Sequence, residues 1–270
     1  MDTDAPTTPP ALPTELAGID ANSLVLLLDV DGVLAPIVDD PAAAAVPAET
    51  VALVQRAVDE CALVGIVTGR GLERAMEMVP VRGAWYAALH GARIVSPDGV
   101  EDVCEVTGGA REHVEVAATL AQTVGWAYED KGATVTIHFR QRGNLGQRVD
   151  PVHVKAQLMT VLNPLKVEVH DAKQVLEVKP KGARTKGDAV RLLSEAAGDA
   201  AKAVVFVGDD LTDLDGFRTI DELREGGSQL RFVKVAVGGD EAPAALVEAA
   251  DVVVPGESAV APLLRALLDA

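Results

Sequence analysis

Short, fully apolar runs separated by helical segments are the feature that most constrains the fold of this chain. The run Leu24–Leu28 contains no polar residue, as is typical of a strand in a sheet that is covered on both faces. Similar runs recur at 62–67, 85–89 and 203–207, and the segments 232–237 and 251–254 look like further, shorter strands. Segments with helical character lie between or after them, at 47–60, 71–78, 186–197, 242–250 and 258–268. This alternation predicts an α/β fold, with a doubly wound parallel sheet as its core.

The segment 103–178 has a different pattern. Apolar and polar residues alternate in Thr134–Arg140, and again at 166–170 and 174–179, which is typical of strands with one buried face. Two helical segments, 111–124 and 151–162, complete it. We therefore expect a smaller α+β domain inserted into the core, with its helices on one face of an antiparallel sheet and a polar face left to meet something else. The expected boundaries are a flexible tail at 1–22, the core at 23–102 and 179–270, and the inserted domain at 103–178.

Charge and composition exclude several kinds of partner. The chain has 270 residues, of which 49% are hydrophobic, and its net charge of −17 comes from 41 acidic and 24 basic residues. Such a field repels nucleic acid and anionic membranes, and it repels small phosphates unless cations gather locally. No apolar run approaches the roughly 18 residues of a membrane span, and the first residues do not resemble a signal peptide. Cys61 and Cys104 cannot form a disulfide framework. We expect a monomeric cytoplasmic protein.

Two carboxylates stand two positions apart after the first apolar run. Asp29 and Asp31 are followed by Gly32, and the period of a strand sends both side chains the same way. Two such charges need either a cation or a shared proton, which points to a divalent metal or to a general acid. Gly32 permits a tight turn whose N–H groups could face an anion. An acidic loop with no role is the alternative, and this motif alone leaves it open.

The run 203–207 is also followed by carboxylates. Asp209, Asp210 and Asp213 fall within five positions, a concentration of negative charge that a cation offsets. The alternative is that Asp210 or Thr212 simply caps the helix that follows.

The run 62–67 ends in Thr68, Gly69 and Arg70. A hydroxyl and a guanidinium at a strand-to-helix junction suit a phosphate oxygen. The alternative is a Thr that caps the helix and an Arg on the surface.

Cations are concentrated in one stretch of this acidic chain. Lys179, Lys181, Arg184 and Lys186 lie within eight positions, and Lys186 begins a helical segment. A solvated basic loop would explain some of them. However, Asp29, Thr68 and Asp209 all follow predicted buried strands, and ligands of doubly wound sheets bind outside the carboxyl ends of the strands. The convergence of these motifs is stronger evidence for a ligand site than any one of them.

These motifs, taken in order, resemble those of the haloacid dehalogenase superfamily. The stretches LLLDVDGVLAPIVDDP, IVTGR, LHG, VLEVKPKGARTKG and FVGDDLTDLDGF more closely resemble trehalose-6-phosphate phosphatases, over most of residues 23–270. Three positions depart from the family pattern: Val33 stands where Thr is usual, and Arg93 and Leu214 stand where Glu is frequent.

The resemblance implies a Mg²⁺-dependent phosphatase that hydrolyses trehalose 6-phosphate in trehalose biosynthesis through an aspartyl-phosphate, with the inserted domain as a cap over the site. It implies Asp29 as the nucleophile and Asp31 as the general acid and base, with Thr68 and Lys186 on the phosphoryl oxygens. The implied metal ligands are Asp29, Asp31 through its main-chain oxygen, and Asp209, supported by Asp210 and Asp213.

The remaining candidates are substrate contacts: Gly32, Gly69, Arg70, His90, His138, Arg140, Glu177 and Lys179. Ordinary solvent-facing strand residues are the alternative for the last four. Two other functions stay open. One is a phosphatase of the same fold for another sugar phosphate, such as mannosyl-3-phosphoglycerate. The other is a non-catalytic sugar-phosphate sensor, which would be expected to have lost the nucleophile or the metal carboxylates.

Overall fold

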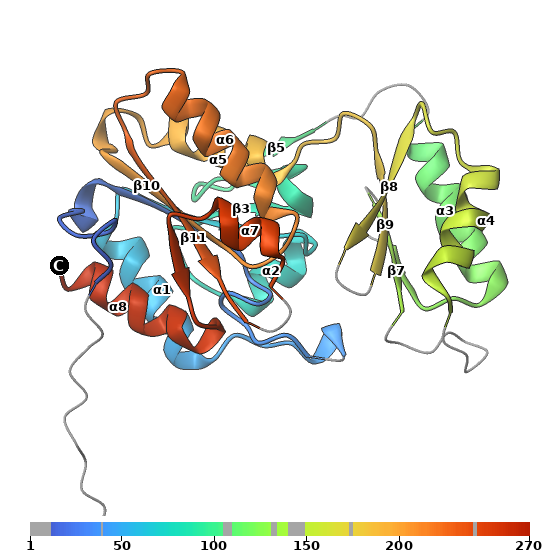
Figure 1. The fold of residues 1–270 in the computed structure, drawn as a ribbon, viewed down its shortest axis with the longest axis horizontal. Coiled ribbons are helices and arrows are strands. Elements are labelled where there is room, and N and C mark those ends of the chain that lie inside the picture. Colours follow the sequence, from blue (N-terminus) through green and yellow to red (C-terminus); the bar gives the residue numbers. More distant parts are fainter. Residues whose placement is uncertain are drawn as a thin grey trace, which may run out of the picture.

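A computed structural model describes residues 12–38, 40–104, 110–130, 134–139, 149–172, 175–239 and 242–270 of the chain. Eight strands form the larger of its two sheets (Figure 1). In order across the sheet they are β12 (Val252–Val254), β11 (Arg231–Val237), β10 (Ala203–Gly208), β1 (Leu24–Leu28), β2 (Leu63–Val67), β3 (Trp85–Ala88), β4 (Arg93–Val95) and β5 (Glu101–Val103). The strands from β12 to β3 are parallel, and β4 and β5 are antiparallel to their neighbours.

Helices cover both faces of this sheet. Leu24, Leu26 and Leu28 belong to one apolar core, which includes residues of α1 (Ala48–Glu60), α2 (Leu72–Met78) and α8 (Val260–Leu268). Val25 and Leu27 belong to the other, with residues of α5 (Lys186–Ala196), α6 (Asp213–Glu225) and α7 (Ala244–Ala249). Successive residues of a strand point to opposite faces, so the fully apolar β1 serves both cores. The doubly wound α/β architecture is confirmed.

The second sheet is antiparallel and has helices on one face only. Its strand order is β6 (Tyr128–Asp130), β7 (Val135–His138), β9 (Val175–Pro180), β8 (Val167–Ala172). The helices α3 (Ala110–Val124) and α4 (Pro151–Val161) share an apolar core with Ile137, Leu176 and Val178. Figure 1 shows these helices on the side away from the larger sheet, so the polar face of the small sheet is turned toward the larger one. We call this unit the cap; its boundaries in the chain stay a prediction.

Polar residues on this face of the cap sheet are less exposed than ordinary solvent-facing strand residues. Thr136 and Glu177 are register partners on β7 and β9, and they are only 5% and 6% exposed. Polar side chains at such burial need partners. Glu177 has such a partner outside the cap sheet, since its Oε2 lies 3.2 Å from His90 Nε2, whereas Thr136 Oγ1 has no hydrogen-bond partner among the described residues.

The sequence pattern does not predict every element of the fold. The strands β4, β5 and β6 have three residues each, too few to show a period, and α6 was expected only as a helix of unstated length. Five short 3-10 helices complete the described part of the chain: Ala21–Ser23, Pro41–Ala43, Leu89–Gly91, Gly198–Ala200 and Glu257–Ala259. None of the helices among the described residues has the length and apolar character needed to cross a membrane.

Candidate active site

Three of the sequence motifs lie at the same edge of the larger sheet, where β1, β2 and β10 end. Leu28 pairs with Val207 on one side and with Ile66 on the other, and the Asp29 backbone N–H donates to the Val207 carbonyl at 3.1 Å. Asp29, Thr68 and Asp209 follow these paired residues by one or two positions. The expected convergence at the carboxyl ends of the strands is therefore found, in the place where doubly wound folds bind ligands.

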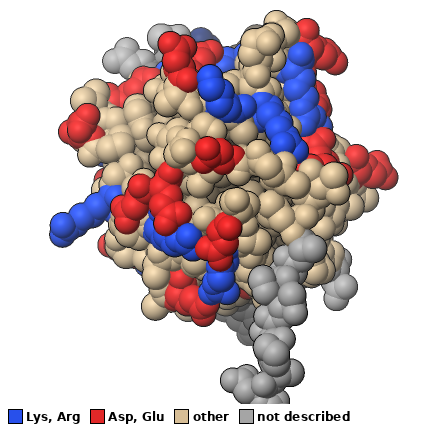
Figure 2. Space-filling view, turned by 90° about the vertical axis from the view of Figure 1, so that its left-hand side faces the viewer, with Lys and Arg blue, Asp and Glu red and all other residues tan. Residues whose placement is uncertain are grey.

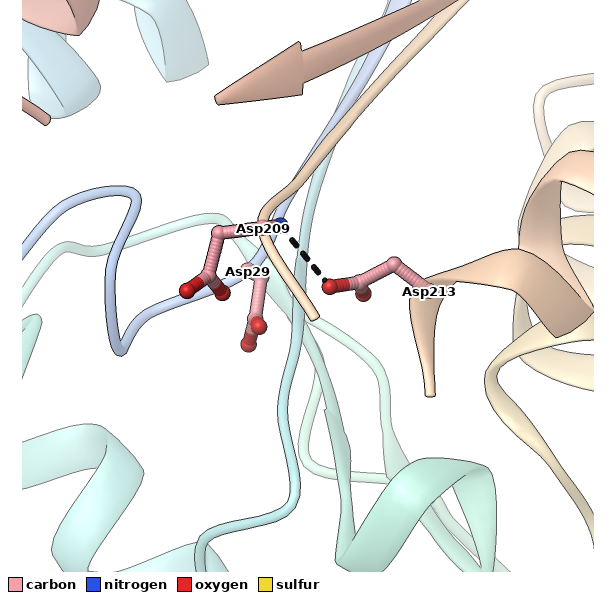
Figure 3. A group of neighbouring side chains, drawn as sticks. All are labelled: Asp29, Asp209 and Asp213. Carbon is pink, nitrogen blue, oxygen red and sulfur yellow. Dashed lines mark hydrogen bonds between the residues drawn. The ribbon is translucent and has the colours of Figure 1, made fainter. Parts of the chain in front are cut away.

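Three buried carboxylates lie together at this edge. One oxygen each of Asp29, Asp209 and Asp213 lies within 4.8 Å of the others, and the three residues are 4%, 5% and 0% exposed. Figure 3 shows the Asp29 and Asp209 carboxylates side by side, while Asp213 reaches the group from the start of α6. Like charges at this separation need compensation.

Lys186 supplies part of that compensation. Its Nζ, on the first residue of α5, lies 2.7 Å from Asp29 Oδ2 and 2.8 Å from Asp213 Oδ1, and its side chain is 2% exposed. Burial would lower the pKa of Lys186, but the carboxylates of Asp213 and Asp29 outweigh it and the pKa is raised. Lys186 therefore remains charged. Lysine was expected at this helix start, and the structure adds that it is paired with two carboxylates.

The cluster is still negative. Three carboxylates against one ammonium leave a net charge of −2 when all are ionised. Burial raises the pKa of Asp29 well above its ordinary value; Lys186 opposes this, and the neighbouring Asp213 and Asp209 add to it. A divalent cation would balance this charge, and carboxylate oxygens are the ligands that small hard cations prefer. The donor set therefore fits a divalent metal.

Asp213 also fixes the backbone of the motif. Its Oδ2 accepts the backbone N–H groups of Asp209 and Asp210, each at 3.0 Å. Asp210 lies beside the cluster, and its own Oδ1 accepts the Leu211 N–H at 2.7 Å. Neither Asp210 nor Thr212 caps α6 with its side chain. The helix-capping alternative for this motif is therefore wrong.

Two glycines allow the backbone to approach the carboxylates. A Cβ on Gly32, whose φ is +75°, would lie 2.0 Å from Asp209 Oδ2, and a Cβ on Gly208 would lie 2.4 Å from the Asp213 Cγ. Either contact is far shorter than van der Waals distance. Gly32 was singled out from the sequence for its turn. The sequence pattern does not predict the close approach at Gly208, although the place of Gly208 directly before two aspartates is a usable signal.

The side chain of Asp31 is paired with that of Arg70. Arg70 donates from Nε to Asp31 Oδ2 and from Nη2 to Oδ1, both at 2.7 Å, and its pKa is raised, first by these hydrogen bonds. Thr68 is 1% exposed, and its Oγ1 accepts the Arg70 backbone N–H at 3.1 Å. Arg70 thus links the motif Thr68–Arg70 to the motif Asp29–Gly32.

His90 connects the core to the cap. Its Nε2 lies 3.2 Å from Glu177 Oε2 on β9, and a Cβ on Gly69 would lie 2.5 Å from the His90 ring. Leu89 and His90 have φ of 52° and 58°, a left-handed conformation that costs roughly 1–2 kcal/mol for each such residue. Strain of this kind is concentrated at functional sites.

The other cap candidates share the polar face of the small sheet. His138 follows Thr136 by two positions on β7, and Lys179 follows Glu177 by two on β9, so all four project from one face. Of these, Glu177 contacts His90, and His138 Nε2 lies 4.0 Å from Glu129 Oε2. The contact of His138, Glu177 and Lys179 with sugar stays a prediction. Arg140 lies outside the described residues.

The structure places the three positions that depart from the family pattern and the residues of the basic stretch. Arg93 pairs with Glu73 at 2.8 Å and Glu101 at 3.0 Å on the core. Val33 and Leu214 are buried. Of the four clustered cations, Arg184 pairs with Asp102 at 2.9 Å, Lys181 is exposed and Lys179 is half-buried.

Comparisons of the sequence identify a family for this chain. The trehalose-phosphatase family model matches residues 27–252. A probable trehalose-phosphate phosphatase of Sinorhizobium fredii is 31% identical over 79% of each chain. Mycobacterial relatives of 30–31% identity are longer, and the chain spans 54–59% of their length.

Solved structures share the fold. The C-terminal domain of Candida albicans trehalose-6-phosphate phosphatase superposes with a TM-score of 0.73 at 22% identity, over 92% of this chain and 93% of that one. A haloacid dehalogenase-like hydrolase from Bacteroides thetaiotaomicron superposes with a TM-score of 0.63 at 17% identity, over 89% and 98%. With its haloacid dehalogenase-like fold and the match to the family model over most of its length, this chain belongs to the trehalose-phosphatase family and is a phosphatase.

Proposed function

We propose that this protein is a Mg²⁺-dependent phosphatase that hydrolyses trehalose 6-phosphate to trehalose and phosphate, and so acts in trehalose biosynthesis. The observation that carries the proposal is the buried pairing of Asp29 with Lys186 beside Asp209 and Asp213. The names of the relatives support the substrate. We infer a cytoplasmic monomer without membrane or nucleic-acid partners, in line with the acidic charge of −17.

Asp29 is the proposed nucleophile. One of its carboxylate oxygens forms a bond to phosphorus while the bond from phosphorus to the sugar oxygen breaks, and Asp31 gives that oxygen its proton. A water molecule then attacks the phosphorus of the aspartyl-phosphate and loses a proton to Asp31, while the bond from phosphorus to the Asp29 oxygen breaks. Phosphate leaves, and both carboxyl groups return to their first state. Acid–base assistance of this kind contributes about 10²–10⁴-fold to the rate.

Charge compensation supports this assignment. Asp29 and Asp209, with the main-chain oxygen of Asp31, would hold Mg²⁺, and Asp210 and Asp213 would support it. When bound, Mg²⁺ supplies the charge that lets an anionic carboxylate and a phosphate ester approach each other. Lys186 and Thr68 would hold phosphoryl oxygens, because phosphoryl transfer depends mainly on position and electrostatics.

The cap would supply the sugar contacts. His138, Glu177 and Lys179 project from the face of the cap sheet that is turned to the core. His90 of the core contacts Glu177 of the cap. A polar surface opposite the phosphate site suits a sugar rich in hydroxyl groups. A cap that closes over the site would also exclude water during formation of the phosphoenzyme.

The test is release of phosphate from a panel of sugar phosphates. Trehalose 6-phosphate, glucose 6-phosphate and mannosyl-3-phosphoglycerate are compared with Mg²⁺ and with EDTA. We expect the highest kcat/KM for trehalose 6-phosphate and no turnover in EDTA. Preference for another ester would replace the substrate, and no release from any of them, with binding retained, would favour a sensor.

The intermediate is tested separately. Rapid acid quenching with labelled substrate should leave label on the protein, and hydroxylamine should release it, as it does acyl phosphates. Asp29→Asn should bind substrate yet carry no label. Asp199→Asn is the matched control, because Asp199 is exposed on a short 3-10 helix. Label retained by Asp29→Asn would contradict the assignment of the nucleophile.

A further inference from the structure

Arg70 is held by three acceptors. Its Nε and Nη2 donate to the two oxygens of Asp31, and its Nη1 donates to the Pro41 carbonyl at 2.9 Å. The Arg70 side chain is 13% exposed, whereas that of Asp31 is 37% exposed. A largely enclosed guanidinium thus fixes a carboxylate that is itself open to a ligand.

The shape of the guanidinium limits what else it can bind. Its five N–H donors lie in one plane, and the edge formed by Nε and one Nη matches the two oxygens of a carboxylate or a phosphate. Asp31 occupies that edge, and the Pro41 carbonyl accepts one N–H of Nη1. A phosphoryl group could use this edge only by displacing Asp31.

We propose that Arg70 is a positioning residue for the general acid and base. It keeps the carboxyl group of Asp31 in place, which in its protonated form gives the proton to the leaving sugar oxygen and in its carboxylate form takes the proton of the attacking water, and it does not bind the transferred phosphoryl group. This inference rests on the proposed function, in which Asp31 carries that proton. It assigns Arg70 a role different from the phosphate contact that its position after Thr68 indicates.

Arg74 provides a matched comparison. It lies on α2, four residues after Arg70, and its Nη2 donates to the carbonyls of Ala42 at 3.0 Å and Ala44 at 2.7 Å. Both arginines therefore anchor the segment around Pro41–Ala44, but the described contacts of Arg74 do not include Asp31. Arg74→Met removes an anchor of this segment and leaves the Arg70–Asp31 pair intact.

The choice of ester separates the two possible roles of Arg70. A departing sugar alkoxide needs a proton, whereas p-nitrophenolate is a stable anion and leaves without one. kcat/KM includes only the steps up to the first irreversible one, which is departure of the leaving group. A defect in Asp31 should therefore lower kcat/KM for the sugar ester and spare the aryl ester, while a lost phosphoryl contact should lower both.

The experiment measures kcat/KM with Mg²⁺ for trehalose 6-phosphate and for p-nitrophenyl phosphate. For Arg70→Met we expect a loss of about 10²-fold with the sugar ester and under about threefold with the aryl ester. Arg70→Lys keeps the charge but not the fork and should show the same split, with a smaller loss. Arg74→Met should behave as wild type. In an Asp31→Asn background, Arg70→Met should cause no further loss, because coupled residues are not additive.

Three results would overturn the inference. They are an equal loss on both esters, the same loss in Arg74→Met as in Arg70→Met, and additive effects of Arg70→Met and Asp31→Asn. If Arg70→Met does not fold, Arg70→Lys carries the comparison with the same criteria. Failure of the proposed function is a separate result: wild type would then release no phosphate from trehalose 6-phosphate, and the comparison is made with the sugar phosphate that it does hydrolyse.

Discussion

Lys186 Nζ lies 2.7 Å from Asp29 Oδ2, and both side chains are almost completely buried. The same ammonium is 2.8 Å from Asp213 Oδ1. One cation therefore holds the proposed nucleophile and the residue that orders the backbone of Asp209 and Asp210. Local structure supports this position, since Thr185 caps α5 directly before Lys186 in a capping box with Asp188.

Removal of this ammonium should destabilise the protein and abolish turnover. Lys186→Met leaves Asp29 and Asp213 buried without their partner, and breaking such a pair costs about 3–5 kcal/mol. We expect a fall of this size in the free energy of unfolding in EDTA, measured with urea, and a smaller fall in Mg²⁺. Lys202→Met is the control, since Lys202 is exposed. Equal stability of Lys186→Met and wild type would contradict the claim that Lys186 stabilises the buried carboxylates.

Gly32 should be irreplaceable for a steric reason. Gly32→Ala would place a Cβ 2.0 Å from Asp209 Oδ2, whereas a Cβ on Gly99, with a similar φ of +78°, would meet nothing within 4 Å. Both alanines carry the strain of a positive φ, roughly 1–2 kcal/mol. Only Gly32→Ala should lose activity, by at least about 10²-fold, because small displacements of positioned groups are that costly. Full activity in Gly32→Ala, or equal losses in both variants, would show that Asp209 tolerates displacement.

Binding of a divalent ion should be visible as stabilisation. A ligand that binds only the folded state adds about 2.7 kcal/mol at 100 times its Kd. Mg²⁺ should therefore raise the melting temperature of wild type, and EDTA should reverse the rise. Asp209→Asn should lose most of this response. Asp215→Asn should keep it, because Asp215 pairs with Arg218 at 3.1 Å on α6 and lies outside the cluster. An equal response in both variants would remove Asp209 from the ligand set.

The sheet and the meeting of the motifs could be predicted because both depend on local pattern. The apolar β1 and the carboxylates after it are adjacent in sequence, and parallel strands bring their carboxyl ends to one edge. Partners separated by many residues could not be predicted in this way. The pairing of Arg70 with Asp31 depends on side-chain rotamers, and the contact of His90 with Glu177 depends on where the cap sits over the core. Neither leaves a signal in the local sequence.

The thiol of Cys61 gives a test of burial by pH. Desolvation raises the pKa of Cys61 to about 12. Since this acid binds its proton more tightly in the folded state, the thiol contributes stability that is lost as pH rises from its unfolded value near 9 towards 12. In a Cys104→Ser background, the rate of alkylation by iodoacetamide should rise about tenfold per pH unit between 8 and 10. A plateau near pH 9, as for a free thiol, would contradict this.

The His90–Glu177 contact should matter for sugar esters and not for esters without a sugar. Glu177→Gln keeps the shape of the side chain but removes the charge that faces His90 Nε2 at 3.2 Å across the cap and the core. Hydrogen bonds to charged groups contribute about 1.5–3 kcal/mol, so kcat/KM for trehalose 6-phosphate should fall by about 10-fold or more, while kcat/KM for p-nitrophenyl phosphate stays within about twofold. The matched control is Glu168→Gln, because Glu168 and His170 form a pair at 2.7 Å within β8 alone. An equal loss with both esters would mean that Glu177 supports the fold of the cap rather than its contact with substrate.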